Sequence, residues 1–368
     1  MAIRVLMITP AINICGGIES FLMNYFRHID RSQFVFDFLT HDDSEPSYRN
    51  EIEALGGKVY VLPPFTPASF FIIKKRFHEI LSENSYTIVH CHMANAAFLY
   101  LKEAKKAGIS VRILHSHQSK SADSFSHAIR NIPLIWFGKR YYTVACACSV
   151  LAGDFLFGNK PYHLVHNAID YSNYAFSAQK RQIRQTQLEI ADESTLVFLH
   201  TGRLCPQKNQ TFLLSIFAQI KKTTTRKVHL FLVGDGEDLP ILQTMVKQLQ
   251  LEQDVTFLGT RKDIPELLSA ADAFLFPSRY EGLSIAALEA QAAGLFVFAS
   301  DTIDSQTDIS GHLIMTSLAT PKEQWAQMIL SNITQHPFDR SQLELSPDFD
   351  ITHNCNEIME LYRNQIGE

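Results

Sequence analysis

The chain has 368 residues, of which 46% are hydrophobic and 19% are charged, and its formal net charge is -5. At about 100–200 residues per domain this length predicts two or three globular domains, and the negative charge gives no reason to expect nucleic-acid binding. None of the six cysteines forms a C-x-x-C pair, which is typical of a reducing compartment. The N-terminus reads as a strand, not a signal peptide, and no uncharged apolar stretch reaches the roughly 18 residues of a membrane span. We therefore expect a cytoplasmic protein.

In the first half of the chain, short apolar runs alternate with longer amphipathic stretches. The apolar runs, which we read as strands, are residues 3–9, 35–41, 58–63, 87–92, 111–117 and 142–149. The stretches between them, which we read as helices, include residues 18–29, 47–55, 70–84 and 95–107. This alternation predicts parallel strands joined by helical crossovers.

The same alternation resumes after a polar boundary at about residues 171–193. Here the predicted strands are residues 195–204, 228–236, 255–260, 273–278 and 295–300, and the predicted helices are 210–223, 238–249, 263–271 and 283–293. We therefore predict an α/β protein with two Rossmann-like doubly wound domains, 1–170 and 171–345, that face a cleft. Residues 346–368 are expected to form a helix that packs back on the first domain. Ligands of such sheets bind beyond the carboxyl ends of the strands.

Two glutamates mark the helix predicted at 283–293. Glu281 precedes this helix and Glu289 lies inside it, eight positions or about 12 Å further along. The backbone N–H groups of Leu283, Ser284 and Ile285 are expected at the helix mouth, where they and the helix dipole favour an anion such as a phosphate. A ligand that contacts both carboxylates would be elongated and anionic in its middle. The alternative is a salt-bridged Glu289 and a solvent-exposed Glu281.

Basic residues and glycines follow other strands of the second half. Arg203 and Lys208 lie in the loop between the first strand and its helix, where a guanidinium and an ammonium suit phosphate oxygens. Their alternative role is as ordinary solvated surface charges. Gly234 ends the next strand, where the backbone can approach a ligand closely. A G-x-G pattern alone is a weak signal.

In the first half, Gly16 and Gly17 follow the first strand, in neither a Walker loop nor a nicotinamide fingerprint. Histidines also collect at strand ends, namely His90, His92, His115 and His117. Four imidazoles suggest zinc, but H-x-H on a strand fixes no tetrahedral geometry and no carboxylate motif accompanies it. We expect no metal, and a sugar-facing role for one of the histidines.

Taken together, the motifs resemble a known family. "GGIESFLMNYFR", "HSH", "HNAID", "TGRLCPQKNQTFLL", "LVGDGEDLPIL", "VTFLGTRKDIPELL" and "PSRYEGLSIAALEAQAAG" occur in this order along nearly the whole chain. The combination resembles the retaining glycosyltransferases of family 4, which have the GT-B fold. Its subset with "GGIESF", "ACS", "HNAID" and "FLGTRKDI" is most similar to bacterial exopolysaccharide or capsule transferases.

The resemblance implies roles for the second-domain residues. Glu289 would bind the ribose hydroxyls of a nucleotide sugar and Glu281 would face the transferred sugar. Arg203 and Lys208 would neutralise the departing diphosphate, and Arg261 would lie near the base through its backbone.

The resemblance also implies roles in the first domain. Gly17 would let the first loop approach the donor phosphates. His117 would reach the donor sugar, with His115 as the alternative because "HSH" allows either alignment.

The implied reaction moves a hexose from a nucleotide diphosphate, expected to be UDP, to an acceptor hydroxyl with retention of anomeric configuration. A front-face route is expected, with electrostatic stabilisation of the departing diphosphate and without a metal cofactor. Two alternatives remain: a nucleotide-sugar 2-epimerase, and a non-catalytic glycan-binding subunit that stabilises a partner transferase. The presence of all four donor residues favours an active enzyme.

The acceptor is expected to be a glycan or a lipid-linked sugar. Basic and aromatic residues mix in the stretches 70–77 and 124–142, which suits peripheral contact with the anionic inner face of a membrane. The alternative is that both stretches are ordinary half-buried helices.

Overall fold

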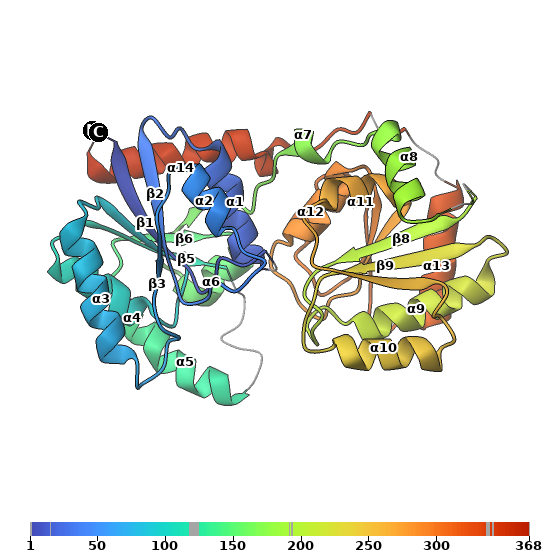
Figure 1. Cartoon of the computed structure of the whole chain (residues 1–368), viewed down its shortest axis with the longest axis horizontal. Helices are drawn as coiled ribbons and strands as arrows, with labels where there is room; N and C mark the ends of the chain where they lie inside the picture. The colour runs from blue at the N-terminus through green and yellow to red at the C-terminus, as the bar shows by residue number, and fades with distance from the viewer. Residues whose placement is uncertain are drawn as a thin grey trace. The chain divides into compact units, whose positions relative to one another are not determined.

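The computed structural model describes residues 2–14, 16–117, 125–190, 192, 194–335, 339–340 and 342–367, without the side chains of 125–130 and 335. The chain divides into two compact units. The first comprises Met1–Ala168 and Ile351–Glu368, and the second comprises Ile169–Asp350. Each unit is built on one sheet with helices on both of its faces (Figure 1).

The first unit contains a seven-stranded sheet in the order β3-β2-β1-β4-β5-β6-β7, and all its strand pairs are parallel. Its strands are β1 (Ile3–Ile8), β2 (Phe34–Thr40), β3 (Val59–Val61), β4 (Ile88–Cys91), β5 (Val111–Ser116), β6 (Val144–Ala147) and β7 (His163–Leu164). Its helices are α1 (Gly17–His28), α2 (Arg49–Ala54), α3 (Phe70–Glu83), α4 (Ala97–Lys106), α5 (Phe125–Gly138), α6 (Val150–Phe157) and α14 (Ile351–Ile366).

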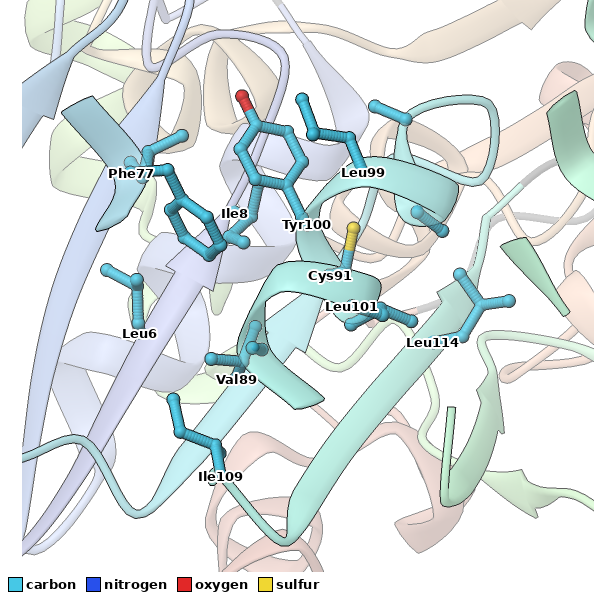
Figure 2. Packing of buried hydrophobic residues seen from close by; sticks show 14 of the residues in the cluster. Leu6, Ile8, Phe77, Val89, Cys91, Leu99, Tyr100, Leu101, Ile109 and Leu114 are labelled. Carbon is cyan, nitrogen blue, oxygen red and sulfur yellow. The ribbon is translucent and has the colours of Figure 1, made fainter. Parts of the chain in front are cut away.

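Alternate residues of the central strands face opposite sides of this sheet, because the side-chain period of a strand is two. Val89 and Cys91 of β4 join the hydrophobic core beneath α3 and α4, together with Phe77 and Tyr100 (Figure 2). The intervening His90 points to the other face, where its ring contacts α14. One strand thus supplies a hydrophobic core on one face and a row of imidazoles on the other.

The second unit contains a six-stranded sheet in the order β10-β9-β8-β11-β12-β13, again with parallel pairs only. Its strands are β8 (Leu196–Thr201), β9 (Val228–Val233), β10 (Val255–Gly259), β11 (Ala273–Phe276), β12 (Phe296–Ser300) and β13 (Leu313–Thr316). Its helices are α7 (Tyr171–Tyr174), α8 (Ala178–Gln187), α9 (Gln210–Thr223), α10 (Leu239–Gln248), α11 (Ile264–Ala270), α12 (Ile285–Ala292) and α13 (Lys322–Gln335), with short 3-10 turns η1 (Ser305–Thr307) and η2 (Pro347–Phe349).

In both sheets the order of strands reverses beside the first strand of the unit. The neighbours of β1 are β2 and β4, and the neighbours of β8 are β9 and β11. Crevices for ligands form at such reversals, outside the carboxyl ends of the strands. The predicted site residues lie at or just after the ends of β1 and β5 in the first unit and of β8, β9, β10 and β11 in the second.

The structure corrects the predicted boundaries near the end of the chain. Residues 346–350 belong to the second unit, not to a terminal segment of the first. Tyr171 Oη donates a hydrogen bond to Ser346 O at 2.7 Å, and Ile169 N donates to Phe349 O at 3.0 Å. These bonds hold η2 against the start of the second unit, so the terminal segment that packs on the first unit begins at Ile351.

The stretch 171–193, which was expected to be a polar boundary, contains two helices. The N-cap of α8 is Ser177, whose side chain accepts a hydrogen bond from Lys180 N. Arg181 of α8 forms an ion pair of 2.7 Å with Asp272, the residue that precedes β11. This contact attaches the polar helix to the sheet. Residues 171–190 are therefore a structured part of the second unit.

Candidate functional site

The loop between β11 and α12 carries the first predicted glutamate. Helix α12 begins at Ile285, and Ser284 is its N-cap, without a hydrogen bond from its side chain. Leu283 and Ser284 are both buried and precede the helix, so they do not form its first turn as predicted. The unpaired N–H groups of a helix start belong to its first residues, which here are Ile285 and the residues that follow. A helix start without a side-chain cap is an anion-binding position.

Glu281, just before this helix, contacts the loop that follows β8. Lys208 Nζ lies 2.7 Å from Glu281 Oε1, and the two side chains are only 16% and 11% exposed. Gln207 Nε2 donates to the same carboxylate oxygen at 3.2 Å and to Tyr280 O at 3.1 Å. The Lys208 ammonium also lies 4.8 Å from the ring centroid of Phe276. Glu281 is therefore not the solvent-exposed carboxylate of the alternative reading, but half of a shielded ion pair.

Arg203 lies in the same loop and is 63% exposed, with an ion pair of 3.0 Å to Glu237. The loop packs closely against the end of β9, where Gly234 has a φ of 126°. A Cβ atom at Gly234 would lie 2.1 Å from Gly202 O, so only glycine fits between the two loops. Gly234 thus has a packing role that brings the Arg203 loop and the β9 loop together.

The two remaining predicted residues of this unit have partners that the sequence did not indicate. Glu289 Oε1 accepts a hydrogen bond of 2.7 Å from Tyr174 Oη in α7. The guanidinium of Arg261 donates to both oxygens of Asp263, at 2.8 and 2.6 Å. Glu289 is half-buried.

In the first unit, four histidines form two hydrogen-bonded pairs at the ends of β4 and β5. His90 Nε2 lies 3.1 Å from His115 Nδ1, and His92 Nδ1 lies 2.8 Å from His117 Nε2. His90 Nδ1 also lies 2.7 Å from the hydroxyl of Tyr362 in α14. His115 is 1% exposed, whereas His117 is partly exposed. Only His117 of the two predicted alternatives is therefore accessible to a ligand.

Burial keeps these imidazoles neutral. It lowers the pKa of His90 and of His117 to about 3, and it lowers the pKa values of His92 and His115 well below the usual range. One nitrogen from each of His90, His92 and His115 lies within 4.8 Å of the other two, a spacing that a metal ion could bridge. Both nitrogens of His90 are nevertheless hydrogen-bonded, as are the Nδ1 atoms of His92 and His115. The Nε2 atoms of His92 and His115 are buried without a hydrogen-bond partner among the described residues, and the absence of a metal stays a prediction.

The loop after β1 leads directly into α1. Gly16 is the N-cap of α1 and Gly17 is its first residue. A Cβ atom at Gly16 would lie 1.8 Å from a carboxylate oxygen of Glu19, so a side chain at this position would displace that carboxylate. Glu19 is 7% exposed, and burial raises its pKa to about 7. Sequence analysis missed this residue, although a glutamate two positions after a glycine pair was visible in "GGIES".

Among the described residues, Lys208 and Glu281 form an ion pair, and the rings of His115 and His117 stack with centroids 4.2 Å apart. The residues that sequence analysis missed are Gln207, Glu237, Tyr174, Tyr362 and Glu19. Of these, Glu19, Gln207 and Glu237 lie inside the quoted motifs, whereas no local pattern distinguishes Tyr174 or Tyr362. Among the described residues, no helix combines the length and the apolar character needed to span a membrane.

Comparison with known proteins agrees with this architecture. The model of "Glycosyltransferase Family 4" matches residues 15–173, and that of "Glycosyl transferases group 1" matches residues 180–341. The Bacillus subtilis protein EpsF, which is named as a glycosyltransferase, is 33% identical over 336 residues, 89% of this chain and 86% of its own length. An Escherichia coli UDP-Gal:alpha-D-GlcNAc-diphosphoundecaprenol alpha-1,3-galactosyltransferase is 26% identical over 230 residues, 59% of this chain and 58% of that enzyme.

Among solved structures, HepE of Anabaena in complex with UDP-glucose superposes with a TM-score of 0.79 at 19% identity, covering 98% of this chain and 99% of that one. The two parallel sheets and this likeness define the GT-B fold. The chain belongs to glycosyltransferase family 4.

Proposed function

We propose that the protein transfers a hexose from a UDP-sugar to an acceptor hydroxyl, with retention of configuration, in the assembly of a bacterial exopolysaccharide or capsule. The observation that carries this proposal is the shielded ion pair of Lys208 and Glu281 beside the uncapped start of α12. It combines a cation and helix amides for a diphosphate with a carboxylate for sugar hydroxyls. UDP-glucose is bound by the structural neighbour HepE, which supports a donor of this class.

In the proposed donor complex, the Lys208 ammonium exchanges part of its contact with Glu281 for a diphosphate oxygen. Arg203 is exposed enough to rotate toward the same phosphates. Glu281 then accepts hydrogen bonds from hydroxyls of the transferred sugar, while Glu289 accepts them from the ribose. Arg261 contributes its backbone near the base, since its guanidinium is already bound to Asp263.

The first unit contributes His117 and Gly17 to the proposed donor contacts. His117 is favoured over His115 because His115 is buried and bonded to His90. Gly17 carries no side chain at the first turn of α1, and the loop can therefore approach the phosphates.

The proposed reaction balances without a protein nucleophile. The bond between the anomeric carbon and the UDP oxygen breaks, and the acceptor oxygen attacks the same face of the sugar. The departing phosphate oxygen takes the proton of the acceptor hydroxyl. Lys208, Arg203 and the start of α12 stabilise the charge that develops on UDP, so we propose that no metal cofactor is needed.

We further propose that the acceptor is a sugar on a polyprenyl diphosphate carrier at a membrane surface. Helices α3 and α5 expose large apolar side chains, with Phe71 at 78%, Ile72 at 56%, Trp136 at 54% and Phe137 at 45%. The Arg140 guanidinium lies 4.0 Å from the Trp136 ring centroid. Helix α3 also buries Ile73 and Phe77 on its other face, as the alternative reading expects, so the proposal rests on the exposed side chains. A relative that acts on a diphosphoundecaprenol sugar supports this acceptor class.

Of the stretch 124–142, Ser124 and the side chain of Arg130 lie outside the described residues. Helices α3, α4 and α5 lie side by side in the first unit (Figure 1). Exposed aromatic and basic side chains on such helices suit an anionic lipid interface. Flotation with anionic vesicles tests this contact: Trp136→Ser should reduce binding, whereas Ile241→Ser, a control at a side chain 59% exposed, should not.

The function is tested by incubation with a panel of nucleotide sugars and an undecaprenyl-diphosphate sugar. The expected result is UDP release with an acceptor heavier by one hexose, whose anomeric configuration is read by NMR. Lys208→Met should abolish the product, while Lys227→Met, at a lysine 74% exposed, should not. A free epimerised sugar would indicate a 2-epimerase. Glycan binding without nucleotide release would indicate a non-catalytic subunit.

A further inference from the structure

The two histidine pairs follow from one repeated register. Strands β4 and β5 pair in parallel with His90 opposite Ile113, and each strand end carries an H-x-H motif on the same face. Both hydrogen bonds between the motifs therefore span the same separation of 25 residues. The rings are also stacked along each strand, with centroids 4.3 Å apart for His90 and His92 and 4.2 Å apart for His115 and His117.

Neutral imidazoles in such a pair determine each other's tautomer. A neutral ring has one nitrogen that donates and one that accepts. In the bond between His92 Nδ1 and His117 Nε2, one nitrogen carries the proton and the other does not. The site of the proton on His92 therefore decides which nitrogen of His117 is protonated.

The burial of His92 decides this choice. Its side chain is 4% exposed, and its Nε2 atom has no hydrogen-bond partner among the described residues. A buried N–H group without an acceptor is rarer than a buried acceptor without a donor. The proton of His92 therefore lies on Nδ1, which donates to His117 Nε2. His117 in turn carries its own proton on Nδ1, its remaining ring nitrogen.

The geometry points to His92 as a positioning residue, which we propose fixes the tautomer and orientation of His117 so that Nδ1–H donates to a hydroxyl of the donor sugar. Phe21 of α1 supports this arrangement, because its ring contacts His117 edge-on with centroids 5.0 Å apart. The inference rests on the proposed function for the identity of the ligand. The coupling of the two rings is a property of the protein alone.

Nitrogen-15 NMR of the full chain labelled at histidine, without ligand, tests the coupling directly, because protonated and unprotonated ring nitrogens differ in chemical shift. His117 should be a single tautomer protonated at Nδ1. His92→Leu should remove this preference, and His92→Asn should keep it, since the amide can donate to His117 Nε2. Tyr362→Phe is the matched control: it removes the hydroxyl bonded to His90 and should leave His117 unchanged.

Kinetics with the donor identified by the panel then test the role in transfer. His92→Leu should lower kcat/KM for the nucleotide sugar by about three- to tenfold, the range of one hydrogen bond, and His92→Asn should restore most of it. A wild-type His117 protonated at Nε2, or a tautomer unaffected by His92→Leu, would overturn the inference. A wild type without transfer but with the predicted tautomer would instead overturn the proposed function.

Discussion

The Tyr174 hydroxyl donates a hydrogen bond of 2.7 Å to a carboxylate oxygen of Glu289, and so connects the four-residue helix α7 to the middle of α12. This contact orients the carboxylate that we assign to the ribose. Glu289→Ala should weaken donor binding about tenfold or more, because a hydrogen bond to a charged group contributes about 1.5–3 kcal/mol. Tyr174→Phe should weaken binding less, since it leaves the carboxylate in place. Titration calorimetry with UDP measures both, and wild-type affinity in Glu289→Ala would remove the assignment.

Glu281→Ala should mainly lower turnover, in contrast to Glu289→Ala. Its carboxylate is assigned to the transferred sugar, and its loss also frees Lys208 from the ion pair. We expect kcat to fall about tenfold or more, with a small change in the KM of the donor. Steady-state kinetics of Glu281→Ala, Lys208→Met and the double variant should show non-additive losses, because the two residues are in contact. Strictly additive losses would mean that the pair does not act as a unit.

Transfer should continue in the presence of a chelator. Lys208, Arg203 and the start of α12 are expected to neutralise the diphosphate, and this role needs no divalent ion. Activity is measured after dialysis against EDTA and after addition of Mg²⁺, Mn²⁺ or Zn²⁺. If activity disappears on dialysis and returns with one ion, a metal takes part, and His90, His92 and His115 become its first candidate ligands.

The buried histidines should make the protein less stable at acidic pH. In the fold, the pKa values of His90 and His117 are about 3, whereas an unfolded histidine takes up a proton below about pH 6.5. The unfolded state therefore binds more protons between these values, and the free energy of unfolding falls as the pH decreases from about 6.5 toward 3. Each ring contributes at most about 1.4 kcal/mol per pH unit.

Denaturant unfolding at pH 7, 6 and 5 measures this slope. His90→Asn should flatten it by removing one buried titrating group. His163→Asn, at an exposed position in β7, is the matched control and should leave the slope as in the wild type. An equal slope in His90→Asn and the wild type would contradict the expected protonation on unfolding.

The effect of Glu19 on stability should be opposite to that of the histidines, because it should lower the free energy of unfolding as the pH rises. Burial raises its pKa from 4.5 to about 7, so its stabilising contribution is complete below about pH 4.5 and is lost as the pH rises through about 7. Glu19→Gln should therefore gain stability relative to the wild type between pH 5 and pH 7.5, by up to about 3 kcal/mol. The comparison uses chemical denaturation, with the exposed Glu357→Gln as control. The same stability difference at both pH values would show that Glu19 does not titrate in this range.

Local patterns were enough to predict most of the parallel strands, because a buried strand reads as a short apolar run bounded by polar residues. Strand β7 was not predicted, because both of its residues are exposed. Helix α8 was not predicted for a related reason. None of its residues is buried, so its sequence lacks the apolar stripe that indicates an amphipathic helix. Both elements depend on contacts with distant parts of the chain.

The candidate site was predictable as a set of residues but not as a set of contacts. Lys208 and Glu281 were each predicted from their positions after strand ends. Nothing in the sequence indicates that Lys208 Nζ lies 2.7 Å from Glu281 Oε1. Gln207, which completes the contact, is 74 positions away from Glu281. The exact start of α12 was also misjudged, because apolar Leu283 resembles a helical residue but is buried in the preceding loop.

The first unit is formed by two separate segments of the chain. This constrains the order in which the two units can fold during synthesis. Helix α14 supplies the buried residues Cys355, Ile358 and Tyr362 to that unit, and these are synthesised only after the whole second unit. The second unit, a single continuous segment, can therefore complete its fold first. Until α14 is synthesised, the face of the N-terminal sheet that packs on this helix, including the imidazole of His90, remains uncovered. A C-terminal truncation that removes the 16-residue helix α14 should accordingly disrupt the N-terminal sheet first.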